Sequence, residues 1–205
     1  MIKDLKICGV SDPKTLNYIL NHPNPPKFIG FITNYKKSRR YVEFENLKNL
    51  VNVNKKQTNF VSVLVNPSDE LLEKIKDLNF DYYQLYDVDP VRTAEIKKKY
   101  KIKIISALTI SNKEDVDKYK DYLEISDIVL FDSKGYHKSE SFDHSLLEQV
   151  PNEVNKMIAG NIQIDDIPNL KNKDFIVDLS GALEDQNGKK DINKIDKLLN
   201  LFKKT

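Results

Sequence analysis

The chain of 205 residues has one cysteine, no tryptophan, three arginines and no long apolar stretch. A single cysteine excludes an internal disulfide framework and a zinc site built from several thiolates. No run approaches the roughly 18 consecutive apolar residues that a membrane span requires. The first residues also lack the long apolar region and the small-residue cleavage site of a signal peptide. We therefore expect a cytoplasmic protein with no membrane contact.

Neither sign of charge dominates, because 33 basic residues face 31 acidic ones and leave a formal net charge of +2. A dedicated nucleic-acid-binding protein would normally show a concentrated basic excess, so we expect no nucleic-acid partner. Hydrophobic residues make up 40% of the chain, which is enough for one sizeable core. The length is short for two ordinary domains, so we predict a single domain over residues 1–205.

Short apolar runs rich in β-branched residues recur at even spacing, and each has the length of a strand. The predicted strands are Leu5–Val10, Phe28–Thr33, Phe60–Val65, Tyr82–Tyr86, Lys103–Leu108, Asp127–Asp132, Asn155–Gly160 and Asp174–Ser180. Most are separated by segments with helical spacing, such as residues 15–20 and 71–78. In the fourth run, Tyr82, Tyr83 and Tyr86 are predicted to be core residues. Apolar strands that alternate with helices are typical of a parallel sheet covered on its outer face.

Eight such units favour closure of the sheet, so we predict an α/β fold with a single small (β/α)8 TIM barrel. Five or six units would have suggested an open, doubly wound sheet. In such barrels the chemistry lies at the C-terminal ends of the strands. The polar residues expected at those ends are Cys8, Gly9, Ser38, Arg39, Arg40, Asp87, Asp132, Ser133, Gly160, Asn161, Asp178, Ser180 and Gly181. A core strand needs no aspartate at its end, so packing does not explain Asp132 and Asp178.

The same strand ends carry short motifs in chain order, beginning with Lys6-Ile7-Cys8-Gly9. The further motifs are Gly30-Phe31-Ile32, Ser38-Arg39-Arg40-Tyr41-Val42, Val63-Leu64-Val65-Asn66, Gln84-Leu85, Leu130-Phe131-Asp132-Ser133, Phe142-Asp143-His144, Ala159-Gly160, Val177-Asp178-Leu179-Ser180, and Glu184 together with Gly188-Lys189-Lys190-Asp191. This ordered set resembles the phosphoribosylanthranilate isomerase family of tryptophan biosynthesis over nearly the whole chain. The first motif alone is weak, whereas the set is specific.

The chain departs from the family pattern at several positions. The family's Q-L-H-G reads Gln84-Leu85-Tyr86-Asp87 here, and Asn161 replaces the second glycine of A-G-G. A glycine-rich stretch is replaced by Tyr136–Ser139, within which Lys138 could take over anion binding. Each change removes backbone freedom or a hydrogen-bond donor close to where the resemblance places the substrate.

The resemblance implies an Amadori rearrangement, in which N-(5-phosphoribosyl)anthranilate, an aminoaldose, becomes a 1-deoxyketose. Opening the furanose requires a proton at the ring oxygen, and a base must then remove the proton of the adjacent sugar carbon. One acid and one base suffice, so we expect no metal and no cofactor. The resemblance makes Cys8 the candidate base and Asp132 the candidate acid.

Each of these two residues also has a structural interpretation. A lone cysteine is commonly a buried packing residue, and Asp132 could cap the turn that follows its strand. A free thiol has a pKa of ~8.5 and needs nearby cations to act as a base at neutral pH, which Lys6 on the same strand face could supply. The Asp132 carboxyl would need a raised pKa, from burial or from a substrate carboxylate, to carry a proton.

The resemblance also implies substrate-binding residues. Arg40 should bind the anthranilate carboxylate or steer the amino-sugar, with the adjacent Arg39 as a competing assignment. Asp178 would lie near the anthranilate ring, although a loop-capping role is an alternative. Backbone N–H groups after the last two strands should hold the phosphate. These phosphate positions are Gly160, Asn161, Ser180 and Gly181.

Two alternatives keep the barrel and its small phosphorylated ligand. One is another sugar-phosphate isomerase or epimerase, and the other is a barrel that binds its ligand without turnover. The missing glycines and Tyr86 favour the binding protein, whereas Cys8 and Asp132 at strand ends favour the enzyme. A metal-dependent epimerase would need histidine ligands at strand ends, which the predicted strands do not supply. We expect a monomer or a weak homodimer.

Overall fold

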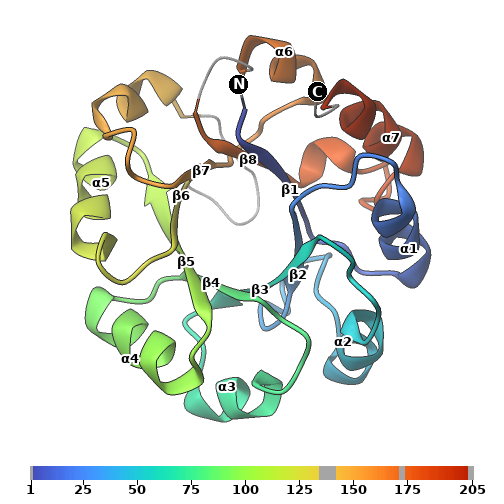
Figure 1. Ribbon diagram of the computed structural model, residues 1–205, viewed down its shortest axis with the longest axis horizontal. Coiled ribbons are helices and arrows are strands. Elements are labelled where there is room, and N and C mark those ends of the chain that lie inside the picture. The colour runs from blue at the N-terminus through green and yellow to red at the C-terminus, as the bar shows by residue number, and fades with distance from the viewer. Residues whose placement is uncertain (1, 134–141, 171–173, 203–205) are drawn as a thin grey trace.

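The computed structural model of the protein describes residues 2–133, 142–170 and 174–202. The described strands are parallel and close into a barrel in chain order, with the first strand paired to the last (Figure 1). The strands are β1 (Asp4–Cys8), β2 (Phe28–Ile32), β3 (Asn59–Val65), β4 (Tyr82–Tyr86), β5 (Lys103–Ile110), β6 (Ile128–Ser133), β7 (Lys156–Ile158) and β8 (Ile176–Leu179). The predicted α/β fold and (β/α)8 barrel are therefore confirmed, and each predicted strand overlaps an observed one.

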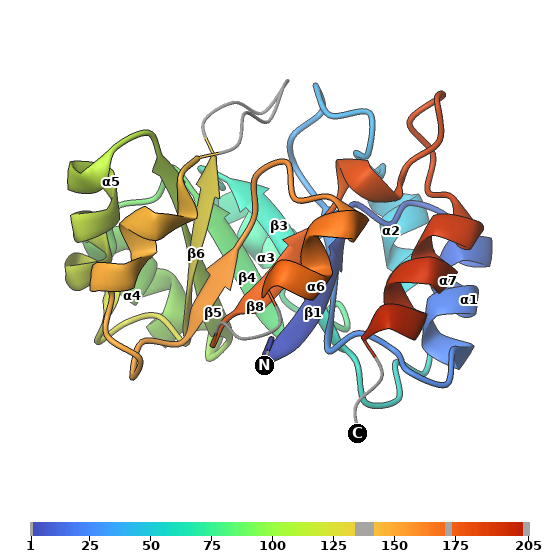
Figure 2. The same ribbon diagram turned by 90° about the horizontal axis from the view of Figure 1, so that it is seen from above.

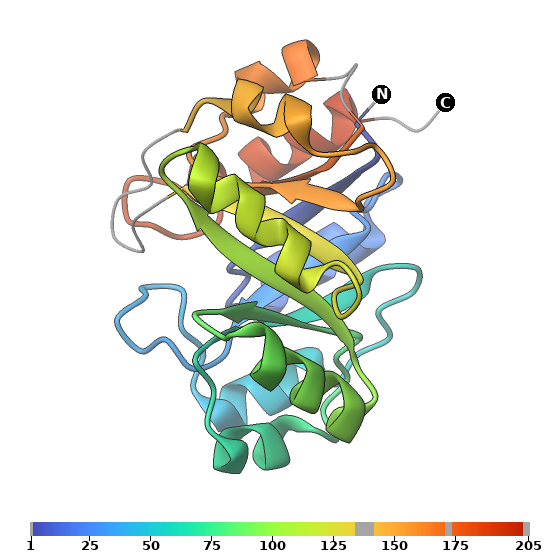
Figure 3. The same ribbon diagram turned by 90° about the vertical axis from the view of Figure 1, so that its left-hand side faces the viewer.

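Helices surround the barrel, and Figures 2 and 3 show α4 and α5 covering the outer face of the strands. The α-helices are α1 (Pro13–Asn21), α2 (Phe44–Val51), α3 (Asp69–Ile75), α4 (Pro90–Tyr100), α5 (Lys113–Asp117), α6 (Ile167–Leu170) and α7 (Ile192–Leu201). Short 3-10 helices are η1 (Lys118–Tyr122), η2 (His144–Gln149), η3 (Ile164–Asp166) and η4 (Gly181–Leu183). Within the three described ranges, none of these helices has the length and apolar character needed to cross a membrane.

Aspartate capping residues mark the N-termini of α1 and α4. Asp12 Oδ1 accepts a hydrogen bond of 2.8 Å from the N–H of Thr15. Asp89 Oδ1 likewise accepts one of 3.0 Å from the N–H of Arg92. In both helices the capping aspartate is followed by a proline in the first turn, where a missing N–H carries no penalty. These caps set where each helix begins after its strand.

The apolar side chains pack in separate layers, because successive strand residues point to opposite faces of the sheet. Outward-facing residues such as Ile7 pack against the helices, whereas inward-facing ones such as Leu130 fill the barrel. Tyr82 and Tyr83 are 8% and 1% exposed, which confirms them as core residues. Tyr86 packs on the interior cluster, but its hydroxyl donates a hydrogen bond to Asp132, so the core interpretation of Tyr86 is incomplete.

A buried ion pair lies where the barrel closes. Lys6 on β1 and Asp178 on β8 are partners in the strand register. Lys6 Nζ lies 2.6 Å from Asp178 Oδ2, and the two side chains are 0% and 5% exposed. Removing two charges from water is costly, and a close opposite charge with good geometry is what offsets that cost. The pair therefore couples the first strand to the last inside the barrel.

Replacing Lys6 by methionine should lower the free energy of unfolding by about 3–5 kcal/mol, because Asp178 is then buried without its partner. The double variant Lys6→Met/Asp178→Asn should recover much of that loss, since no uncompensated charge remains. Urea unfolding of the two variants and the wild type measures both effects. A single variant as stable as the wild type, or a double variant no better than the single, would contradict this account.

Candidate active site

The C-terminal ends of the strands surround a cavity of about 720 Å³. All of the predicted site residues line it, namely Cys8, Arg40, Asp132, Gly160, Asn161, Asp178, Ser180 and Gly181. The strand register thus brings together side chains that are far apart in the chain. The predicted substitute loop, Tyr136–Ser139 with Lys138, lies outside the described residues.

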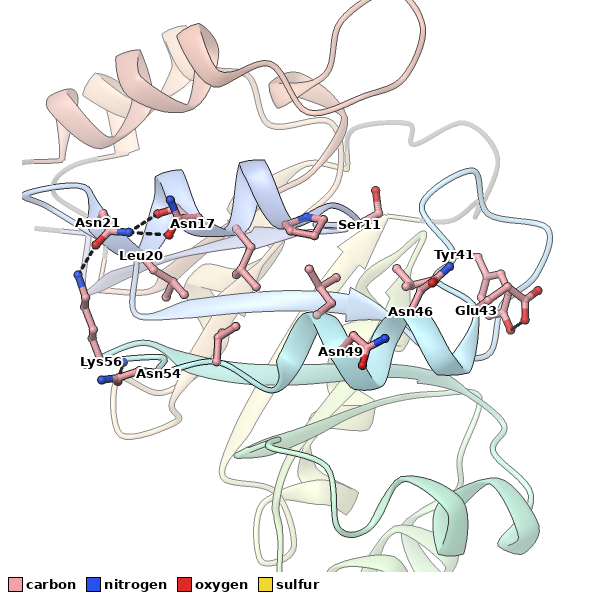
Figure 4. A pocket seen from close by; sticks show the side chains of 15 residues that line it. Ser11, Asn17, Leu20, Asn21, Tyr41, Glu43, Asn46, Asn49, Asn54 and Lys56 are labelled. Carbon is pink, nitrogen blue, oxygen red and sulfur yellow. Dashed lines mark hydrogen bonds between the residues drawn. The ribbon is translucent and has the colours of Figure 1, made fainter.

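Another cavity, of about 850 Å³, lies on the outer surface between α1 and α2 (Figure 4). Its walls carry several amide side chains, and Asn21 donates to Asn17 Oδ1 and accepts from Lys56. Amide side chains do not exchange protons near neutral pH. None of the predicted site residues lines this second cavity.

Cys8 ends β1 and lies beside the Lys6 ammonium. Gly30 on the neighbouring β2 makes room for both, since a Cβ there would lie 2.9 Å from Cys8 Sγ and 3.1 Å from Lys6 Nζ. Burial raises the pKa of the Cys8 thiol above its ordinary value, while Lys6 and Lys190 act in the opposite direction. The predicted influence of Lys6 on the thiol is present, but burial outweighs it.

Asp132, near the end of β6, is held through both of its carboxyl oxygens. The Tyr86 hydroxyl donates to Oδ2 at 2.7 Å, and the N–H of Ser133 donates to Oδ1 at 2.8 Å. Burial raises the pKa of Asp132 to about 6, although the bond from Tyr86 opposes the shift. A carboxyl group with such a pKa can carry a proton near neutral pH, as a general acid must.

Arg40 reaches the cavity mouth and pairs with Glu184. Arg40 Nη2 donates to Glu184 Oε2 at 3.1 Å, and Arg40 Nε donates to Oε1. The Arg40 side chain crosses Gly9, where a Cβ would overlap Arg40 Cδ and where φ is +77°. Arg39 also contacts Glu184, but its side chain is 59% exposed and does not line the cavity. This placement favours Arg40 over Arg39 as the arginine that meets a ligand.

The sequence interpretation assigned no role to Glu184 and Lys190, although both lie in a motif that carries the resemblance. The Glu184 and Lys190 side chains are each 2% exposed, and Lys190 Nζ lies 3.1 Å from Glu184 Oε1. Lys190 also donates to the carbonyl oxygen of Ser180 at 2.9 Å. Ser180 Oγ in turn donates to the carbonyl oxygen of Cys8 at 3.0 Å. Burial lowers the pKa of Lys190 to about 8. These contacts join the loop after β8 to Arg40 and to the end of β1.

The backbone turns sharply after β7. Gly160 has φ +99°, and a Cβ there would lie 2.7 Å from Ser133 Oγ, so only glycine fits without displacement. Asn161 has φ +52°, a left-handed conformation that asparagine tolerates better than most residues. Asn161 Oδ1 accepts a 2.9 Å hydrogen bond from Gln163 Nε2. At this position, where the family pattern has glycine, asparagine therefore keeps a glycine-like backbone.

The fold and the site together define a (β/α)8-barrel protein whose mouth carries an acid, a thiol and an arginine around one cavity. The sequence model described as N-(5'phosphoribosyl)anthranilate (PRA) isomerase matches residues 5–201. The chain belongs to the N-(5'-phosphoribosyl)anthranilate isomerase family.

Individual relatives agree with this assignment. The N-(5'-phosphoribosyl)anthranilate isomerase of Agrobacterium fabrum is 30% identical over 207 residues, which cover 96% of this chain and 93% of the relative. That of Campylobacter jejuni is 33% identical over 209 residues, which cover 98% of each chain. Among solved structures, phosphoribosylanthranilate isomerase from Thermotoga maritima is 24% identical, covers 98% of each chain and has a TM-score of 0.82. Another, solved in complex with reduced 1-(o-carboxyphenylamino)-1-deoxyribulose 5-phosphate, is 23% identical over 98% of this chain and 97% of its own, with a TM-score of 0.80.

The raised pKa of Asp132 has a consequence for stability. Because the folded protein disfavours the carboxylate, this group's contribution to the free energy of unfolding falls as the pH rises from ~4 to about 6. Asp132→Asn does not titrate, so its stability relative to the wild type should increase over this interval by up to about 3 kcal/mol. Urea unfolding of both proteins at pH 4 and pH 7.5 measures the change. A difference that stays constant or shrinks with pH would contradict the shift.

Proposed function

We propose that the protein catalyses the Amadori rearrangement of N-(5-phosphoribosyl)anthranilate to 1-(2-carboxyphenylamino)-1-deoxyribulose 5-phosphate, in tryptophan biosynthesis. The observation that carries the proposal is the single cavity shared by Cys8 of β1 and Asp132 of β6. An aldose–ketose conversion needs one proton delivered and one removed at adjacent parts of the substrate. Family membership supports the same reaction class.

In this mechanism Asp132 protonates the furanose ring oxygen, and the C1–O bond breaks as the nitrogen lone pair forms the protonated imine. Cys8, as thiolate, then removes the C2 proton. The electrons of the broken C2–H bond form the C1–C2 double bond, and those of the C1–N double bond move to the nitrogen, which gives the neutral enolamine. Tautomerisation of the enolamine gives the ketone. The nearby Lys6 ammonium stabilises the thiolate, as its effect on the pKa of Cys8 indicates.

The other predicted site residues bind the substrate. The pair with Glu184 uses two of the five N–H donors of Arg40, and the remaining donors would bind the anthranilate carboxylate. Among the described residues, no protein group hydrogen-bonds to Asp178 Oδ1, which is buried and would accept from the substrate. The phosphate would lie on the backbone N–H groups of Gly160, Asn161, Ser180 and Gly181.

Four further expectations stay predictions. These are a monomer or weak homodimer, a cytoplasmic location, the lack of a nucleic-acid or membrane partner, and catalysis without metal or cofactor. The acid–base pair is consistent with the last of these, because both proton transfers are assigned to side chains of the protein.

Cys8→Ser and Asp132→Asn should each lower turnover by roughly 10²- to 10⁴-fold, because each removes one of the two proton-transfer groups. Loss of substrate fluorescence, with phosphoribosylanthranilate generated enzymatically, follows the reaction. Circular dichroism checks that both variants are folded. Two variants with wild-type turnover would overturn the assignment of Cys8 and Asp132. No fluorescence change with wild-type protein at high concentration would favour the barrel that binds a phosphorylated ligand without turnover.

Arg40→Lys should raise KM by roughly tenfold or more, because an ammonium does not reproduce the planar donor set of a guanidinium. Arg39→Lys is the matched control, since it removes an adjacent arginine that also contacts Glu184 but does not line the cavity. Its KM should stay within about twofold of the wild type. Equal effects in the two variants would indicate that the arginines act through Glu184 and not through the substrate.

A further inference from the structure

A chain of hydrogen bonds crosses the barrel interior from β4 to Asp132. Gln84 and Tyr86 are two residues apart on β4, so both side chains point into the barrel. Gln84 Nε2 lies 3.2 Å from Tyr86 Oη, and Tyr86 Oη lies 2.7 Å from Asp132 Oδ2. The chain thus links a residue in the barrel interior to the candidate acid at the mouth.

The chemistry of the three groups determines which of them donates in each of these hydrogen bonds. The Gln84 amide nitrogen can only donate, so it occupies a lone pair of the Tyr86 hydroxyl. The single proton of that hydroxyl is then directed to Asp132 Oδ2. Gln84 is 1% exposed, so water does not readily compete for these contacts. The other carboxyl oxygen of Asp132 is held by the N–H of Ser133.

We propose that Tyr86, oriented by Gln84, is a positioning residue that fixes the Asp132 carboxyl at the cavity and sets how strongly it holds its proton. This inference rests on the proposed role of Asp132 as the general acid. It also gives a function to a departure from the family pattern, because Tyr86 stands where Q-L-H-G has histidine. A histidine there would titrate near neutral pH, whereas burial raises the pKa of Tyr86 well above its ordinary value. Tyr86 therefore remains a neutral donor while Asp132 titrates.

The other charges around Asp132 do not replace this donor. Asp178 of β8 raises the pKa of Asp132, while Lys6 of β1 lowers it. Lys6 and Asp178 are paired with each other, so their effects on Asp132 oppose one another. Cys8 of β1 acts electrostatically on Tyr86 but is a neutral thiol while its pKa is raised. Burial raises the pKa of Asp132, and without the Tyr86 hydroxyl this effect would be only weakly opposed.

The direct test is the pKa of Asp132, measured by carboxyl-carbon NMR of protein labelled with ¹³C-aspartate. Asp132→Asn identifies the signal. Tyr86→Phe should raise this pKa by about one unit, because a hydrogen bond to the charged form is lost. Tyr83→Phe is the matched control, as Tyr83 lies on the same strand but packs in the cluster outside the barrel. An unchanged or lowered pKa in Tyr86→Phe, or an equal shift in the control, would overturn the proposal.

Gln84→Met tests whether Gln84 donates a hydrogen bond to Tyr86 or accepts one from it. If Gln84 donates to Tyr86, its loss weakens the bond from Tyr86 to Asp132, and the pKa of Asp132 should rise by less than in Tyr86→Phe. If Gln84 instead accepted the hydroxyl proton, its loss would release that proton toward Asp132 and lower the pKa. A lowered pKa in Gln84→Met would therefore contradict the proposed orientation.

The pH dependence of kcat/KM connects the same groups to activity. The active form has a protonated Asp132 and a deprotonated Cys8. Because the pKa of Asp132, about 6, lies below that of the thiol, the amount of this form rises with pH only up to the pKa of Asp132. The low-pH limb of kcat/KM therefore reports the pKa of Asp132. In Tyr86→Phe this limb should move to higher pH by the shift that NMR measures, and in Tyr83→Phe it should not move. A limb that stays in place while the NMR pKa shifts would overturn the link between Tyr86 and catalysis. If the wild type shows no turnover, the proposed function fails, whereas the NMR measurement still decides whether Tyr86 controls Asp132.

Discussion

The ion pair between Lys6 and Asp178 is the interaction on which the barrel mouth depends. It lies at the register position where the first strand meets the last, and it is almost wholly buried. Two charges at such depth are tolerated because each neutralises the other. The same pair sits directly below Cys8 and influences the pKa of both Cys8 and Asp132. The same ion pair therefore links the closure of the sheet to the pKa values of the candidate base and the candidate acid.

A second buried carboxylate organises the rim of the cavity. Glu184 accepts from Arg39, Arg40 and Lys190, and neighbouring positive charges lower its pKa although burial opposes them. These contacts join the loop after β2 to the loop after β8. An arginine held in this way has little conformational freedom left to lose when a ligand arrives. The rim is therefore organised before substrate binds.

The two candidate proton-transfer groups have different environments within the same cavity. Burial raises the pKa of the Cys8 thiol and of the Asp132 carboxyl, but only Cys8 has a lysine on its own strand. Asp132 is instead held by neutral donors, the Tyr86 hydroxyl and the N–H of Ser133. A cation favours the thiolate, and neutral donors leave a carboxyl that can still be protonated. Such divided environments are how one site supplies both an acid and a base.

The alternation of strands and helices, the barrel, and the strand ends that carry Cys8 and Asp132 were all predictable from the amino-acid sequence. These features follow from short apolar runs rich in β-branched residues and from the helical spacing between them, which are properties of a few neighbouring positions. The folded barrel was needed to show that Tyr86 donates a hydrogen bond to Asp132, 46 residues away, and that Glu184 holds Arg40. The fold was likewise needed to show that burial raises the pKa of Cys8 by more than Lys6 lowers it. Such contacts depend on the register of the closed barrel and on depth below its surface, and neither quantity is a property of any short segment.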